Sequence, residues 1–145
     1  MKSHKDLEVW KQAVSLAGLV YEVTKGFPAD ERFGLTTQMR RAAVSIASNI
    51  AEGAARHSDK EFVRFLHIAS GSASELDTQL EIAELAGIAR REDIAPLCST
   101  RADIENDLRT HPFHPEIANP FHLTRSGTPL EGHLSLVTDH RLPPS

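Results

Sequence analysis

The sequence is poor in cysteine and has no long apolar run. Cys98 is the single cysteine among 145 residues, which excludes an internal disulfide and disfavours a cysteine-based metal cage within one chain. No apolar run approaches the roughly 20 residues that span a bilayer, and the N-terminal MKSHKDLEVW lacks the apolar segment of a signal peptide. We therefore expect a cytoplasmic protein with no membrane partner.

Recognisable catalytic patterns are also missing. There is no nucleophile elbow, no glycine-rich phosphate loop, no HExxH and no repeated Glu-x-x-His of a di-metal bundle. Glu52 and Glu75 could be considered an acid–base pair, but carboxylates beside arginines are more often ion-paired with a lowered pKa. The sequence thus predicts a non-enzymatic protein with no cofactor, no metal and no evident small-molecule substrate.

What remains is the composition of an ordinary soluble globular domain. Apolar residues make up 40% and charged residues 25%, and the formal net charge is -4. A net negative charge does not favour nucleic acid or anionic lipid as a partner, although a local basic patch could still bind either.

Helical periodicity runs through the first three quarters of the chain and is absent from the remainder. It predicts helices over residues 6–25, 35–56, 59–86 and 91–109, with Gly26 in the left-handed position after the first helix and Ser58 capping the third. Trp10 and Tyr21 lie on the apolar stripe of the first helix and are interpreted as core residues. Residues 110–145 hold six of the eight prolines and five of the eight histidines, and no sustained period.

These segments predict an all-α fold: an up-down-up-down antiparallel four-helix bundle over residues 1–109, followed by an irregular or disordered Pro/His-rich tail over residues 110–145. Within this tail, residues 133–137 form a short apolar stretch that could dock locally.

The most unusual feature is a row of polar residues beside the apolar stripe of the second helix, matched by a second row on the third helix. The two rows are Gln38, Arg41, Ser45, Asn49 and Glu52, and Ser72, Glu75 and Gln79. Buried polar groups must find partners, and one row can satisfy the other.

Charge supports that pairing. Residues 32–56 hold four arginines and one glutamate, whereas residues 58–87 hold Lys60 and Arg64 against six acids. Complementary pairing between neighbouring helices or subunits is the simplest interpretation, with Arg41 and Glu75 as a buried ion pair. Two alternatives stay open, which are a ligand site along the seam and nucleic-acid contacts through Arg40, Arg41 and Arg56.

Small residues crowd both rows, as in AAVSIAS and SGSAS. Small side chains allow helices to approach closely and suit a flat contact between subunits. Four helices of this size also leave some apolar surface unburied, so we expect the protein to associate with itself.

Two segments resemble the four-helix-bundle family linked to 23S rRNA intervening sequences, which is often labelled ribosomal-protein-like: LTTQMRRAAVSIASNIAEG and KEFVRFLHIASGSASELDTQLEIA. Two earlier segments fit the same family pattern, DLEVWKQAVSLAGLVYEVTKGFP and ERFGL. The resemblance covers roughly residues 5–90, and the sequence departs from the family pattern after about residue 98. It implies a bundle that assembles as a ring, with a pentamer as the expected form. It also implies a structural or assembly role for the residues that match signature positions: Arg41, Ser45, Asn49, Glu52, Gly53, Ser72, Glu75 and Gln79.

A related branch, the accessory variability determinant of diversity-generating retroelements, partners a reverse transcriptase and binds nucleic acid through basic surfaces. Two hypotheses follow. The first is a self-associating interaction scaffold without enzymatic activity. The second is an RNA- or DNA-binding accessory protein that uses the basic face of the second helix and further arginines: Arg40, Arg41, Arg56, Arg64, Arg90 and Arg91.

Overall fold

Helices account for nearly all of the computed structural model, which describes residues 3–111. The elements in chain order are η1 (His4–Asp6), α1 (Glu8–Thr24), η2 (Ala29–Glu31), α2 (Leu35–Ala55), α3 (Asp59–Leu85) and α4 (Arg91–Thr110). Residues 3–111 contain no strand, so the predicted all-α fold with four helices is confirmed. The predicted tail, with its apolar stretch at residues 133–137, lies outside the described residues except for Thr110 and His111.

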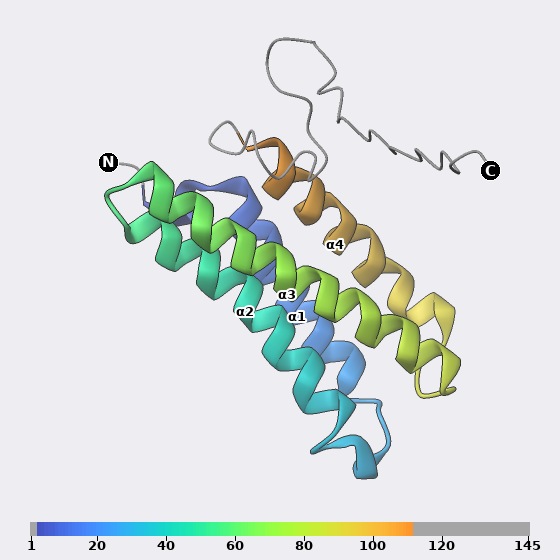
Figure 1. Ribbon diagram of the computed structural model, residues 1–145. Coiled ribbons are helices and arrows are strands. Elements are labelled where there is room, and N and C mark those ends of the chain that lie inside the picture. Colours follow the sequence, from blue (N-terminus) through green and yellow to red (C-terminus); the bar gives the residue numbers. More distant parts are fainter. Residues whose placement is uncertain (1–2, 112–145) are drawn as a thin grey trace, which may run out of the picture.

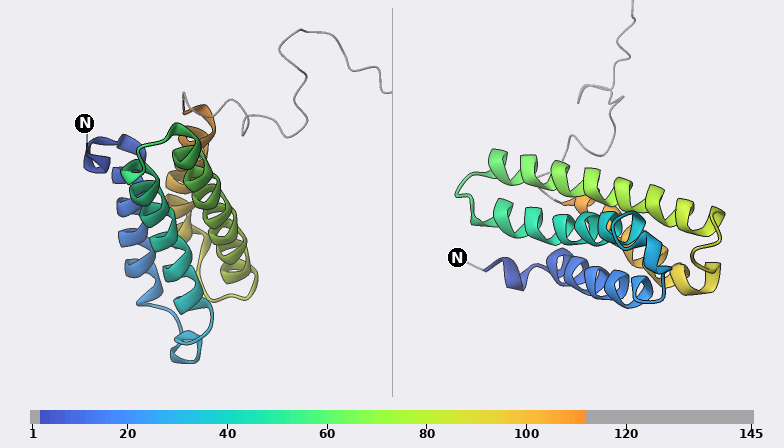
Figure 2. Two further views of the ribbon diagram at one scale, coloured as in Figure 1. Left: turned by 60° about the vertical axis from the view of Figure 1, so that its left-hand side comes forward. Right: turned by 90° about the horizontal axis from the view of Figure 1, so that it is seen from below.

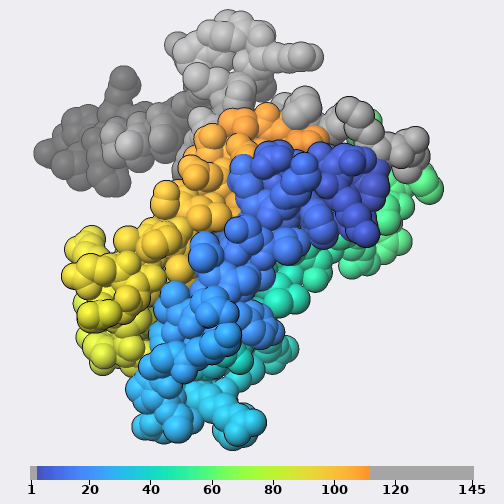
Figure 3. Space-filling view, turned by 180° about the vertical axis from the view of Figure 1, so that it is seen from behind, coloured from blue at the N-terminus to red at the C-terminus, as the bar shows by residue number. Residues whose placement is uncertain are grey.

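The four α-helices lie side by side, and the connections alternate between the two ends of the molecule (Figure 1). The α1–α2 and α3–α4 connections lie at one end, whereas the α2–α3 connection lies beside the N-terminus at the other. Each helix packs on the next one, and α4 returns to pack on α1. Figure 2 shows α2 between α1 and α3, and Figure 3 shows α1 and α4 side by side on the opposite face.

One stripe of each helix forms the core. The largest fully buried side chains are Leu16, Val20, Met39, Ile46, Ile50, Leu66, Leu76, Leu80, Leu97, Ile104 and Leu108. Complete burial of one such side chain stabilises the fold by about 1.5–3 kcal/mol before conformational entropy is counted. Alanines at 13, 43, 69 and 73 are also fully buried, which lets the helices approach closely.

The ends of the helices follow the sequence in part. The Ser58 side chain accepts a hydrogen bond from the backbone N–H of Glu61, as predicted. After α3, Gly87 has a φ of +68°, with hydrogen bonds from Ile88 N to Ala83 O (2.9 Å) and from Gly87 N to Glu84 O (3.0 Å). These two bonds form a Schellman motif, which needs a residue that tolerates positive φ.

Two local predictions about α1 are corrected. Gly26 does not take the left-handed conformation, because within residues 3–111 Gly87 alone has positive φ. Instead, α1 ends in successive tight turns, with Gly26 N donating to Val23 O and Phe27 N donating to Thr24 O (both 3.2 Å). At the other end, the first helical turn separates as η1, because Ser3 and Asp6 form their own capping box there.

The helices α2 and α3 lie close together at Gly53, which is buried. A Cβ atom built on Gly53 would lie 2.7 Å from Cβ of Phe65 and 3.0 Å from Cδ2 of Phe62. A larger residue would therefore push the two helices apart at this point.

None of the helices within residues 3–111 is both long enough and apolar enough to cross a membrane.

Candidate functional site

The two predicted polar rows meet in the middle of the α2–α3 seam. The hydroxyls of Ser45 and Ser72 lie 2.9 Å apart, and Ser72 also donates to the backbone oxygen of Ile68 (3.2 Å). Asn49 Nδ2 donates to Ser45 O (2.8 Å) and to Ser45 Oγ (3.0 Å). This short network satisfies half-buried polar groups between two closely packed helices, which is a structural role.

The expected buried pair between Arg41 and Glu75 is absent. Both residues are exposed, and the described chain contains no ion pair between them. They line one surface groove of about 390 Å³ together with Gln38, Ala42 and Ser45. Glu75 accepts a hydrogen bond from Gln79 Nε2 (3.1 Å) on its own helix. The reason is geometric, since both positions lie on the outer edge of the seam, where water can solvate them.

The last member of the α2 row, Glu52, also has its partner beyond its own position on α2 and not on α3. Glu52 pairs with Arg56 on its own helix (2.8 Å), and both side chains are about half exposed. None of the ion pairs among the described residues joins α2 to α3, so the complementary charges of these two helices are not paired with each other there.

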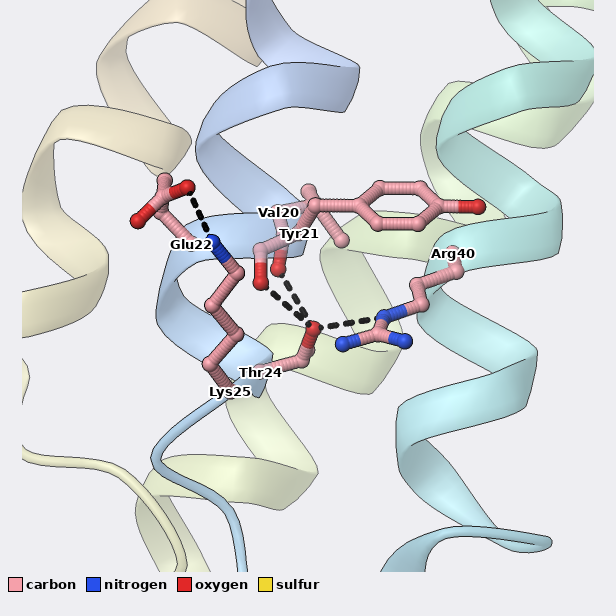
Figure 4. Close-up of polar contacts among 6 residues, drawn as sticks. All are labelled: Val20, Tyr21, Glu22, Thr24, Lys25 and Arg40. Carbon is pink, nitrogen blue, oxygen red and sulfur yellow. Dashed lines mark hydrogen bonds and ion pairs between the residues drawn. The ribbon is translucent and has the colours of Figure 1, made fainter.

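A cluster that the sequence did not indicate joins α1 to α2 (Figure 4). Arg40 Nε donates to Thr24 Oγ1 (2.9 Å), and its guanidinium carbon lies 4.6 Å from the centre of the Tyr21 ring. Thr24 is itself held by donating to Val20 O (2.7 Å) and to Tyr21 O (3.2 Å). We call Arg40, Thr24 and Tyr21 the arginine clasp. It lies beside a groove of about 450 Å³ whose lining is Tyr21, Thr37, Arg40, Arg41, Val44 and Ser45.

The clasp corrects the interpretation of Tyr21 as a core residue. Its side chain remains 43% exposed, because the core stripe of α1 runs through Leu16, Val20 and Thr24. Trp10, by contrast, is half-buried and packs against the core as expected.

The six arginines proposed as nucleic-acid contacts are dispersed. Arg40 and Arg41 lie on α2, Arg56 and Arg64 lie near the α2–α3 connection, and Arg90 and Arg91 lie at the opposite end of the molecule (Figure 1). Four of them have acidic partners, which are Glu52 for Arg56, Glu61 for Arg64, Asp93 for Arg90 and Glu84 for Arg91. Arg40 and Arg41 form no ion pair with another described residue.

Sequence reasoning missed the most buried ion-paired side chain of the described chain, Arg101 on α4, which is 13% exposed. It contacts Asp77 on α3 (2.9 Å) and Glu105 on its own helix (2.6 Å). An arginine at a core-facing position of a weakly apolar helix was the signal that could have been used, since such a charge needs a partner.

Exposed apolar residues gather along two stripes, each around a glycine inside a helix. The first, on α1 and α2, is Val14, Gly18, Tyr21 and Val44; the second, on α3, is Ile68, Gly71 and Ile82. A Cβ atom built on Gly18 or Gly71 would have no described atom within 4 Å apart from the backbone of its own helix. We call these the α1–α2 stripe and the α3 stripe.

Burial shifts the pKa of two described side chains, Cys98 and His111. Burial raises the pKa of the Cys98 thiol, which favours its protonated form. Burial also lowers the pKa of His111, whose ring meets Phe62 edge-on. Within residues 3–111, no group of three or more His, Cys, Asp or Glu side chains could hold a metal ion.

The fold and the seam define a small α-helical bundle protein with an interhelical polar network and exposed apolar stripes. The chain belongs to the 23S rRNA-intervening sequence protein family, whose model matches residues 5–109. The family match thus extends past residue 98 through α4, which corrects the expected departure from the family pattern. No curated protein matches the chain.

Among solved structures, the fold is similar to that of a protein of unknown function from the S23 ribosomal protein family of Bacteroides thetaiotaomicron VPI-5482. The two share 23% sequence identity with a TM-score of 0.63, over 70% of this chain and 94% of the other. At this identity the likeness supports the fold alone.

Proposed function

We propose that this protein is a self-associating interaction scaffold without enzymatic activity, built on an up-down-up-down antiparallel four-helix bundle. A ring of identical copies, with five as the expected number, is the form that the family resemblance implies.

The observation that carries the proposal is the empty space over Gly18 and Gly71. A glycine inside a helix costs about 1 kcal/mol relative to alanine, and no neighbour among residues 3–111 requires either one. Both are flanked by apolar side chains that are 42–48% exposed. A second chain packed closely on these stripes would explain both why glycine stands at these two positions and why apolar side chains around them are exposed.

Light scattering of the purified full chain over a range of micromolar concentrations tests the proposal. We expect a mass of several chains, and a strict monomer throughout would overturn it. Gly71→Gln should remain helical and at least as stable to heat at high dilution, because glutamine favours helices, yet it should shift the mass toward the monomer. Ala102→Gln, at an exposed position of α4, is the matched control and should leave the mass unchanged.

A second candidate function is RNA or DNA binding through α2. It is favoured by Arg40 and Arg41, which have no acidic partner in the described chain, and by the rRNA-linked description of the family. The dispersal of the other arginines and their acidic partners weigh against a broad contact.

Fluorescence anisotropy with labelled RNA and DNA at increasing salt concentration tests this alternative. A specific complex should weaken steeply with salt. In Arg40→Gln/Arg41→Gln, the slope of the logarithm of the binding constant against the logarithm of the salt concentration should become shallower by the amount expected for about two lost phosphate contacts. A protein that binds neither probe even at low salt is not a nucleic-acid-binding protein of this kind.

A further inference from the structure

We infer that the arginine clasp and Arg41 of one copy bind the Glu75 carboxylate on the α3 stripe of a second copy of this chain. This inference rests on the proposed self-association and specifies which surfaces meet.

The clasp presents a pre-positioned cation. The Thr24 hydroxyl accepts a hydrogen bond from Nε of Arg40, and the Tyr21 ring lies against the face of the Arg40 guanidinium (Figure 4). The Arg40 side chain is therefore held from two sides. Its two Nη atoms make no hydrogen bond to another described residue. An arginine fixed in this way loses little freedom when it binds a carboxylate, for which its planar fork is well suited.

Arg41 adds a second cation one residue further along, on the same groove of about 450 Å³. The groove also contains the Tyr21 ring and Val44, so it offers positive charge and apolar surface together. It suits an acidic side chain that is flanked by apolar residues.

The α3 stripe presents that combination. Glu75 is exposed, forms no ion pair with another described residue, and lies between Ile68 and Ile82 along the helix. Gln79 donates to Oε1 of Glu75, which orients the carboxylate and leaves the second oxygen available. Gly71 lies one turn before Glu75 and leaves room for a protruding ring such as Tyr21.

The two surfaces lie on different helices of the same chain and adjoin at the groove that Arg41 and Glu75 both line, so each copy has one of each. A contact in which the clasp of one copy binds the α3 stripe of the next, whose own clasp binds a third copy, is heterologous, and it generates a ring when the rotation closes. The charge pattern thus favours a second copy over an unrelated partner, because the same chain carries both halves of the contact.

Charge reversal on each side tests the contact in the full-length protein after nuclease treatment. Arg40→Glu/Arg41→Glu and Glu75→Arg should each weaken self-association at least tenfold in sedimentation equilibrium. An equimolar mixture of the two variants should associate again, because each then carries the surface that complements the other. Arg109→Glu on α4, where the native residue is exposed and has no ion pair among the described residues, is the matched control and should associate like the native chain.

Circular dichroism melting identifies a variant that fails to fold. If Arg40→Glu disrupts the clasp, Arg41→Glu alone paired with Glu75→Arg repeats the test, because Arg41 is exposed and forms no ion pair with another described residue. Two results would overturn this inference and leave the scaffold proposal standing, provided that the native protein associates. In the first, both variants associate as well as the native protein; in the second, the mixture of the two variants stays monomeric. A native protein that is monomeric, or that becomes monomeric after nuclease treatment, would overturn both.

Discussion

At the scale of single residues, the ion pairs of this protein differ sharply in how much water surrounds them. Most join exposed side chains one helical turn apart, and pairs of that kind contribute at most about 1 kcal/mol. Arg101 is different, because it is largely buried and joins α3 to α4. The stability of the α3–α4 contact should therefore depend on this one side chain.

We expect Arg101→Ala to lower the free energy of unfolding by about 1–3 kcal/mol, because Asp77 and Glu105 lose a charged hydrogen-bond donor and the aliphatic stem leaves a gap. Arg64→Ala removes an exposed arginine whose pair with Glu61 spans 3.6 Å, and it should change stability by less than about 1 kcal/mol. Urea denaturation compares the two. Equal effects would mean that Arg101 contributes no more than a surface charge.

His111 should make the end of α4 sensitive to acid. Burial holds its pKa below the ordinary value of 6.5, so the unfolded chain takes up a proton at a higher pH than the folded chain does. Stability from this group is therefore fully present above pH 6.5 and is lost as the pH falls below it. Between pH 7.5 and 5.5 the melting temperature of the native protein should fall more than that of His111→Gln. Parallel decreases would show that His111 is not responsible.

At the scale of helices, the α2–α3 pair depends on a close approach that only glycine permits. Gly53→Ala should lower stability by about 1–3 kcal/mol, because the added methyl meets Phe65 and Phe62, and this exceeds the gain in helix propensity. Gly18→Ala, whose added methyl meets no described neighbour within 4 Å outside its own helix, should instead stabilise by up to about 1 kcal/mol. Chemical denaturation at concentrations where the midpoint no longer depends on protein concentration measures both. If Gly53→Ala left the free energy of unfolding unchanged, the two helices could move apart at this position without loss of stability.

The helices themselves could be predicted from the sequence because each buries a stripe of apolar residues at helical spacing, even where that stripe is short, as on α4. The boundaries of α2 and α4 agree to within one residue, and Ser58 and Gly87 delimit α3 as their residue types suggest. Gly26 was interpreted wrongly because a glycine after a helix permits the left-handed conformation without requiring it.

Side-chain contacts between helices could be predicted only in part. Periodicity placed Ser45 and Ser72 on facing rows, and they do meet. It could not tell which polar positions lie at the centre of the seam and which at its edge, so Arg41 and Glu75 were paired wrongly. The clasp and the Arg101–Asp77 pair depend on how far each helix is rotated about its axis, which one sequence does not fix.

At the scale of the whole molecule, residues 3–111 form a packed core but leave apolar side chains exposed on the surface. The interior is filled mainly by apolar side chains, yet Tyr21, Val44, Ile68 and Ile82 remain exposed. The neighbouring charges of Arg40, Arg41 and Glu75 form no ion pair with another described residue. Burial of these stripes between copies would bring opposite charges together and fill the space over the two glycines. The central claim of the account is therefore that unlike faces of neighbouring copies meet.

Disulfide trapping between copies tests that claim most directly. In a Cys98→Ala background, Val44→Cys on the α1–α2 stripe and Ile68→Cys on the α3 stripe are made in separate chains and mixed under mild oxidation. Native residues at both positions are 42–43% exposed, so the new thiols are accessible. We predict that the mixture forms cross-linked dimers much faster than either variant alone. The account would be contradicted if each variant cross-linked with itself as fast as the mixture cross-links. It would also be contradicted if no sample cross-linked.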